Sequence, residues 1–228
     1  MPARMIRTNC KSVTGFLVPS DGTEPYYFES LLEGDLGTIL CFLSPKLIVK
    51  FEAQPLTLRS SGSIDQSQRY TPDTRIVFRG GPFLRKCSTS RPWLVEVKYS
   101  DDLRKRWSEY RRRFRLATHY AMKSGCFFHI LTERHIRTEL LRTSRFLVPY
   151  RRIPARPEIV KKILDFVRLN RTATPTEILA AASLGPSDGL IELSQTWRLL
   201  AFGLLPFDLN LPLTPMTRLQ LPAEAAHV

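Results

Sequence analysis

The sequence predicts an α/β protein that carries a second, mostly helical domain, and three observations support this prediction. Segments with helical spacing alternate with strand-like segments up to about residue 145. Residues 148–157 then carry three prolines and three arginines with no apolar period, as is typical of a linker. Beyond them, three segments with helical spacing precede a proline-rich, alternating tail. We therefore expect domains at 1–147 and 158–228, joined by a linker at 148–157.

The first domain is expected to open with a helix over residues 28–43, because its leucines and isoleucines recur with helical spacing after the turn-like DGTEP. The elements expected after it are one or two strands within 47–60, a strand at 69–78, a strand at 93–100, a long helix from Asp101, a short buried strand at 126–133 and a helix at 135–147. This succession predicts a sheet flanked by helices.

The second domain is expected to contain three helices and a small β wing. The segment EIVKKILDFVRLN is amphipathic, and the next segment opens with Thr174 as N-cap, Pro175 at the first helical position and Glu177 completing a capping box. A third helix is expected within 189–205, followed by the alternating tail. Three short helices and a wing predict a winged-helix-like domain.

The charge of the chain favours polyanionic partners, with nucleic acid first and an anionic membrane second. The net charge is +13 and the pI is near 10.0. Residues 1–157 hold 28 Lys/Arg against 14 Asp/Glu, whereas residues 158–228 hold 6 against 7. No apolar run approaches the roughly 20 residues that span a bilayer, and the N-terminus lacks the apolar core of a signal peptide, so we expect an intracellular protein without a membrane partner.

The stretch WLVEVK places two charges inside a strand that otherwise reads as buried. Side chains two apart share a face, so Glu96 and Lys98 point the same way while Val97 faces the other. A desolvated carboxylate and ammonium must be paired or bound to something charged. Asp73, at the turn-like TPD of a preceding strand, is a natural neighbour. Asp73 and Glu96 could hold a hard divalent cation, while Lys98 orients a water or neutralises charge on a phosphate.

The first helix adds two acids to this set. Glu29 and Glu33 are four residues apart and are expected on one helix face, where either could complete the shell of the cation. Such a site, beside a basic surface, has the parts that hydrolytic DNA cleavage needs. Two plainer interpretations remain open at this point: an exposed ion pair for Glu96 and Lys98, and a solvated helix face for Glu29 and Glu33.

The long helix from Asp101 is the expected DNA-facing element. Its apolar stripe leaves seven basic side chains on the other faces, with Glu109 among them. The predicted DNA-binding residues are Arg104, Lys105, Arg106, Arg111, Arg112, Arg113 and Arg115. A merely solvated face is the alternative.

The order of these motifs resembles one known family. FESLLEGD, FEAQP, YTPDT, WLVEVK, the basic helix and FFHILTERHIR follow one another as in the TnsA endonuclease subunit of heteromeric cut-and-paste transposons. The resemblance covers about residues 10–145. The wording of FEAQP and YTPDT is similar to that of TnsA proteins from transposons that have recruited CRISPR targeting complexes.

The resemblance implies a restriction-endonuclease-like core of the PD-(D/E)xK class. It implies Glu33, Asp73, Glu96 and Lys98 as catalytic residues and Glu33, Asp73, Glu96 and Val97 as the metal site. Glu29 lies outside the catalytic part of the match and stays an auxiliary residue of open role. Some members have Gln at the position of Glu96, and the carboxylate here strengthens the metal-binding interpretation. The implied cofactor is Mg²⁺, for which Mn²⁺ can substitute.

The resemblance also implies partners. A TnsA subunit cuts the 5′ ends of the element, the non-transferred strands, while a TnsB-type DDE recombinase cuts and joins the 3′ ends under a TnsC-type AAA+ ATPase. We expect this cleavage to take place at transposon-end DNA, in the nucleoid of a bacterial cytoplasm. The near-neutral charge of residues 158–228 favours docking to a protein over DNA binding. The alternatives are a stand-alone nuclease or resolvase of the same fold and a non-catalytic DNA-binding adaptor.

Overall fold

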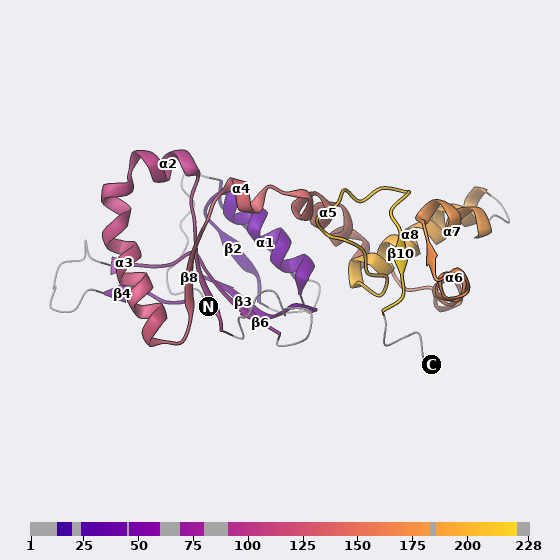
Figure 1. Ribbon diagram of the computed structural model, residues 1–228, viewed down its shortest axis with the longest axis horizontal. Helices are drawn as coiled ribbons and strands as arrows, with labels where there is room; N and C mark the ends of the chain where they lie inside the picture. The colour runs from indigo at the N-terminus through magenta and orange to yellow at the C-terminus, as the bar shows by residue number, and fades with distance from the viewer. Residues whose placement is uncertain are drawn as a thin grey trace. The chain divides into compact units, whose positions relative to one another are not determined.

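A computed structural model describes residues 13–19, 24–44, 46–59, 69–79, 91–182 and 186–222. The chain divides into two compact units, Met1–Arg137 and Thr138–Val228. Figure 1 shows the elements of each unit along the chain. Within the described ranges, no helix is both long and apolar enough to cross a membrane.

A four-stranded mixed sheet is the centre of the first unit. Its strands are β3 (Ile48–Ala53), β6 (Thr74–Phe78), β7 (Trp93–Val97) and β8 (Phe127–Leu131), in the order β3-β6-β7-β8. β6 is antiparallel to both β3 and β7, whereas β7 and β8 run parallel. Two short ladders accompany the sheet, β1 (Gly15–Leu17) with β2 (Tyr26–Phe28) and β4 (Leu58–Arg59) with β5 (Arg69–Tyr70). The sheet flanked by helices agrees with the α/β prediction.

Helices α1 (Leu31–Leu43) and α3 (Trp107–Lys123) cover opposite faces of this sheet (Figure 1). On the α1 side, the Tyr26 hydroxyl lies 2.7 Å from the Thr74 hydroxyl. A Cβ at Gly37 of α1 would come within 2.6 Å of the Tyr26 ring, so glycine permits this close approach. On the α3 side, Tyr70, Tyr110 and Phe114 form a buried cluster with Leu58 and Ala117. The sheet therefore lies between two packed layers, one formed with α1 and the other with α3.

Three expected helices have different bounds from the prediction. The first begins at Leu31 rather than at residue 28, because Phe28 pairs in β2 and Ser30 caps the helix. The long helix from Asp101 is two helices, α2 (Ser100–Lys105) and α3, since Arg106 leaves helical geometry with φ −118° and ψ 24°. Likewise, the helix expected at 135–147 is divided into α4 (Glu133–Ile136) and α5 (Glu139–Leu147).

The second unit is built from helices and one two-stranded ladder. Its elements are α5, a 3₁₀ helix at Val148–Arg152, α6 (Pro157–Asn170), α7 (Pro175–Ala182), α8 (Pro186–Phe202) and the strands β9 (Thr172–Ala173) and β10 (Leu219–Gln220). The capping box of α7 is present: the Thr174 N–H donates to Glu177 Oε2 over 2.8 Å, and the Glu177 N–H donates to Thr174 Oγ1 over 3.2 Å. The ladder joins the strand after α6 to the tail.

The segment expected to be a linker is folded into the second unit. Arg151 is buried, and its Nε and Nη2 both donate to the carbonyl of Ala201, over 3.0 and 2.9 Å. The Arg156 N–H donates to Gln195 Oε1 over 3.1 Å, and Gln195 Nε2 donates to the carbonyl of Pro154 over 3.1 Å. Prolines fix this backbone without a regular helix, while arginine and glutamine side chains bond it to α8. The boundary between the units therefore lies ten residues before residue 148, between 137 and 138.

Candidate active site

Asp73 is held at the start of β6 by main-chain contacts. Its Oδ2 accepts a 2.7 Å hydrogen bond from the Val97 N–H, and its carbonyl accepts one of 2.8 Å from the Gln54 N–H. The paired register of β6 and β7 begins at Thr74 and Val95. The Val97 N–H lies beyond it, so the Asp73 carboxylate takes the place of a strand partner. The position of this carboxylate is thus fixed by the end of the ladder.

Glu96 is a buried carboxylate with both oxygens engaged. It is only 4% exposed. Its Oε2 accepts a 2.6 Å bond from the Tyr70 hydroxyl, and its Oε1 lies 2.8 Å from Lys98 Nζ. Tyr70 is itself buried against α3. The tyrosine therefore fixes the orientation of the carboxylate from the side of the core.

Lys98 follows β7 directly, and its ammonium contacts three oxygens. Nζ lies 2.8 Å from Glu96 Oε1, 3.0 Å from the Val97 carbonyl and 3.5 Å from Asp73 Oδ2. The main-chain N–H of Lys98 continues the parallel ladder by donating to the Leu131 carbonyl over 3.1 Å. The structure thus brings Asp73, Glu96, Val97 and Lys98 together, although the sequence places Asp73 more than twenty residues from the others.

Glu33 lies near these residues but caps its own helix. Its Oε2 accepts from the Glu29 N–H over 2.9 Å, its Oε1 accepts from the Ser30 hydroxyl over 2.8 Å, and its N–H donates to Ser30 Oγ. This is a variant of the capping box, because the carboxylate accepts from the N–H of Glu29, the residue before the cap, rather than from that of Ser30. Glu29 precedes the helix, so the expectation that Glu29 and Glu33 share a helix face is wrong. The reason is that the chain is still leaving β2 at Glu29.

Burial and mutual repulsion raise the pKa values of the acids. The pKa of Glu96 is raised to about 7, first by burial and then by the charge of Asp73. The pKa of Glu33 is raised to about 7 by the same two causes, and burial raises the pKa of Asp73. Burial opposes the charge of Lys98, but the carboxylates of Asp73 and Glu96 raise its pKa above the ordinary value. Three acids around one ammonium leave an excess of negative charge.

The oxygens around Lys98 fit a hard divalent cation. Mg²⁺ and Mn²⁺ prefer carboxylate and carbonyl oxygens. Asp73, Glu96 and the Val97 carbonyl supply three of these, and one cationic group already contacts all three. Among the residues that the structure describes, no three His, Cys, Asp or Glu side chains converge on one point. The Glu33 oxygens instead accept from the Ser30 hydroxyl and the Glu29 N–H, although Glu33 lies within reach of the charge of Asp73.

The seven predicted DNA-binding residues of α2, Arg106 and α3 are all exposed. Arg104 pairs with Asp101, and Arg106 pairs with Asp102 and Glu109. The other five form no ion pair with any residue described by the structure. Burial and the charge of Glu96 raise the pKa of Tyr70, and the charge of Arg113 offsets part of this rise, so Arg113 lies on the flank of α3 near the site. Part of this basic surface therefore borders the acids.

Arg137, the last residue of the first unit, is tied to both sides of the site. Its Nε donates to Asp35 Oδ2 over 3.0 Å, and its Nη2 donates to the Tyr99 hydroxyl over 3.0 Å. Asp35 is buried in α1, two residues after Glu33, and Tyr99 directly follows Lys98.

Two residues of the site were missed at the level of sequence. Tyr70 stands three residues before Asp73 in YTPDT, and Gln54 belongs to FEAQP. Gln54 is buried with φ +47°, and its Oε1 has no partner among the described atoms. The available signal was their position inside two motifs that otherwise read as strand ends. Nothing in the spacing alone indicated that a tyrosine would bond Glu96.

A comparison with protein families matches residues 46–133 to the family described as TnsA-like endonuclease N terminal. No curated protein matches the chain. The match includes Asp73, Glu96 and Lys98 but neither Glu33 nor the second unit. A domain of this family implies a restriction-endonuclease-like fold, with which the mixed four-stranded sheet agrees. The match does not support the association with CRISPR targeting.

Proposed function

Because residues 46–133 belong to the TnsA-like endonuclease family, we propose that the chain is a metal-dependent DNA endonuclease subunit of a heteromeric transposase. It would cut the 5′, non-transferred strands at transposon ends. A TnsB-type recombinase would process the 3′ ends under a TnsC-type ATPase, at the nucleoid of a bacterial cell. The single observation that carries the nuclease proposal is the contact of the Lys98 ammonium with Asp73, Glu96 and the Val97 carbonyl.

Asp73, Glu96 and the Val97 carbonyl would hold Mg²⁺ or Mn²⁺, with Glu33 close by. A bound cation of this kind supplies Lewis-acid polarisation of the phosphate and lowers the pKa of a water. Tyr70 holds Glu96 in place, and the Val97 N–H holds Asp73. These contacts keep the acids in position before any substrate arrives.

The ammonium of Lys98 supplies a positive charge that can offset the negative charge that develops during phosphodiester hydrolysis. The attacking water loses a proton, negative charge builds on the phosphate oxygens, and the leaving oxygen gains a proton. An ammonium kept protonated by two carboxylates can stabilise that charge or orient the water. Exposed basic residues near this flank, Arg113 among them, would bind the DNA backbone.

The test is DNA cleavage by the assembled transposase with Asp73→Ala or Lys98→Ala in this chain. We expect at least about a 10³-fold loss of 5′-strand cleavage, with binding to the partner proteins retained. Normal cutting by both variants would refute the site. A Glu52→Gln variant, which removes a half-buried acid of β3 that pairs with Lys50 and Arg75, is the matched control and should cut normally.

The purified chain alone separates the alternatives. A subunit of a transposase should leave supercoiled plasmid nearly intact with Mg²⁺ or Mn²⁺, whereas a stand-alone nuclease should nick it. Calorimetry with Mn²⁺ addresses the non-catalytic adaptor: no heat of binding in the wild type would favour that adaptor.

A further inference from the structure

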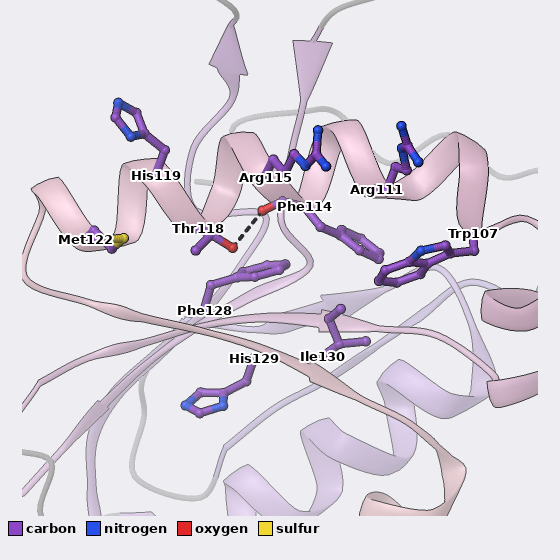
Figure 2. A pocket seen from close by; sticks show the side chains of 10 residues that line it. All are labelled: Trp107, Arg111, Phe114, Arg115, Thr118, His119, Met122, Phe128, His129 and Ile130. Atoms are coloured by element: carbon purple, nitrogen blue, oxygen red, sulfur yellow. Dashed lines mark hydrogen bonds between the residues drawn. The ribbon is translucent and has the colours of Figure 1, made fainter.

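A groove of about 610 Å³ lies between α3 and the edge strand β8, away from the acids described above. Figure 2 shows the side chains that line it, from α3 above and β8 below. Those used in the argument are Trp107, Arg111, Arg115, Met122, Phe128 and Ile130. Trp107 and Met122 are large apolar side chains with 51% and 75% exposure. The groove thus combines exposed apolar surface with two guanidinium groups.

The floor of the groove is a free sheet edge. In the sheet, β8 pairs with β7 alone. The Phe127 N–H and the Leu131 carbonyl bond toward β7, so by alternation the main-chain groups of Phe128 and Ile130 point away from it. Among the described residues, none bonds to those outward groups. The strand sequence FFHIL carries no proline, lysine or other charge of the kind that protects edge strands.

The two arginines of the groove face away from the acidic site. On a helix, residues two apart lie roughly 200° apart around the axis, so Arg111 and Arg113 occupy opposite flanks of α3. Arg113 acts on Tyr70 beside the site, whereas Arg111 and Arg115 line the groove. One basic flank of α3, with Arg113, thus borders the acidic site, and the other, with Arg111 and Arg115, borders the groove.

We propose that this groove docks an extended, acidic segment of a partner protein, which adds a strand to β8. A segment of about five residues would match Phe127–Leu131, with its main chain bonded to Phe128 and Ile130. Its apolar side chains would pack beneath α3 against Trp107 and Met122. Its carboxylates would pair with Arg111 and Arg115, because the residues that line the groove include no acid.

Charge favours such a partner over the chain itself. Residues 1–12 hold three Lys/Arg and no acid, residues 80–90 hold two and no acid, and residues 60–68 hold a single acid, so none of these segments offers a carboxylate for each arginine. A second copy paired through β8 would bring its own Arg111 and Arg115 toward those of the first. Like charges placed together oppose such pairing.

The test is selection of a random twelve-residue peptide library, displayed on phage, against the full chain. We expect enrichment of peptides that alternate acidic and apolar residues. A labelled selected peptide should bind at least about 30-fold more weakly to the variant Arg111→Glu/Arg115→Glu than to the wild type. Replacing alternate peptide residues with proline should also abolish binding, since proline removes the main-chain donors. Selection that yields no peptide dependent on both arginines would overturn the proposal.

The matched control is Arg112→Glu/Arg113→Glu, which makes the same change of charge on the same helix. We expect it to retain the peptide and to lose more affinity for a 30-base-pair duplex than the first variant does. If Arg111→Glu/Arg115→Glu loses as much DNA affinity as the control, the groove binds DNA and the proposal fails. If the wild type sediments as a dimer and Arg111→Glu/Arg115→Glu sediments as a monomer, the occupant of the groove is a second copy and the proposal also fails. Thermal unfolding checks that both variants fold.

Discussion

The two units bury polar groups in opposite ways. In the first, Asp73 and Glu96 contact one ammonium, Glu33 lies within reach of their charge, and the pKa values of all three acids are raised. In the second, buried Arg151 and Gln195 bond main-chain groups of their own unit. Acids in excess of the basic groups that can pair with them cost stability when they are buried and ionised, whereas hydrogen-bonded polar groups cost little. The first unit thus gathers ionisable groups at one site, whereas the second uses its buried polar groups to hold its own main chain.

The charges of the units refine this contrast. Met1–Arg137 holds 23 Lys/Arg against 13 Asp/Glu, and Thr138–Val228 holds 11 against 8. The second unit is therefore mildly basic rather than near-neutral, because residues 138–157 belong to it. Protein docking by this unit remains a proposal and rests on its lower charge density.

The largest expected effect comes from removing the second unit after Arg137. We expect loss of detectable complex with the partner proteins, measured by size-exclusion chromatography, while Mn²⁺ binding to the first unit persists. The cut keeps the Arg137 contacts intact. An equal loss of bare DNA affinity would show that the second unit binds DNA instead.

The next effect is a pH dependence of stability confined to the first unit. Glu33 and Glu96 have pKa values of about 7 when folded and 4.5 ordinarily, so the folded state holds more protons between these values. The free energy of unfolding should therefore fall as pH rises from 4.5 to about 7, by about 3 kcal/mol for each of the two acids. Above that range, Mn²⁺ should restore stability, because it binds the ionised acids.

Urea denaturation followed by tryptophan fluorescence can measure this for each unit. A Trp197→Phe variant leaves Trp93 and Trp107 to report the first unit, and the Trp93→Phe/Trp107→Phe variant leaves Trp197 for the second. A midpoint for the first unit that rises across the same pH range would contradict the pKa directions.

A smaller effect tests whether residues 148–157 are folded. Arg151→Ala should destabilise the second unit by about 2–3 kcal/mol, because it leaves the Ala201 carbonyl without its two donors. The neighbouring Arg152→Ala is the control, since Arg152 is exposed, and should change stability by less than about 0.5 kcal/mol. Equal small effects in urea denaturation would indicate a linker after all.

The smallest effects compare the two capping boxes. Ser30→Ala and Thr174→Ala should each cost about 1 kcal/mol of stability in their own unit. Only Ser30→Ala should also weaken Mn²⁺ binding in calorimetry, because Ser30 holds the Glu33 carboxylate near Asp73. Weaker Mn²⁺ binding in both variants would mean that the units are not independent.

The sequence predicted the parts of the fold that depend on local patterns. The alternation of WLVEVK, the apolar stripe of α3 and the Thr174 capping box each specify an element within a few residues. It did not predict the break at Arg106, since all neighbouring residues favour a helix. Nor did it predict that Arg151 would be buried, because its partner carbonyl is fifty residues away.

The same division applies to the site. Glu96 and Lys98 follow from strand alternation, and Asp73 from its place at a strand start, and the structure brings these three together. The roles of Tyr70 and Gln54 depend on where β5 and β3 end relative to β6 and β7, which no spacing reveals. Glu33 was placed near the site by resemblance, but its capping bonds with Ser30 and Glu29 depend on where α1 begins.

Arg137 gives the chain a mechanical property. The point where the polypeptide leaves the first unit is anchored to α1 through Asp35 and to the residue after Lys98 through Tyr99. A pull or twist applied through the rest of the chain would first load these two anchors, one on each side of the acids. Asp35 lies two residues after Glu33 and Tyr99 directly follows Lys98, so we expect such a force to reach both sides of the site.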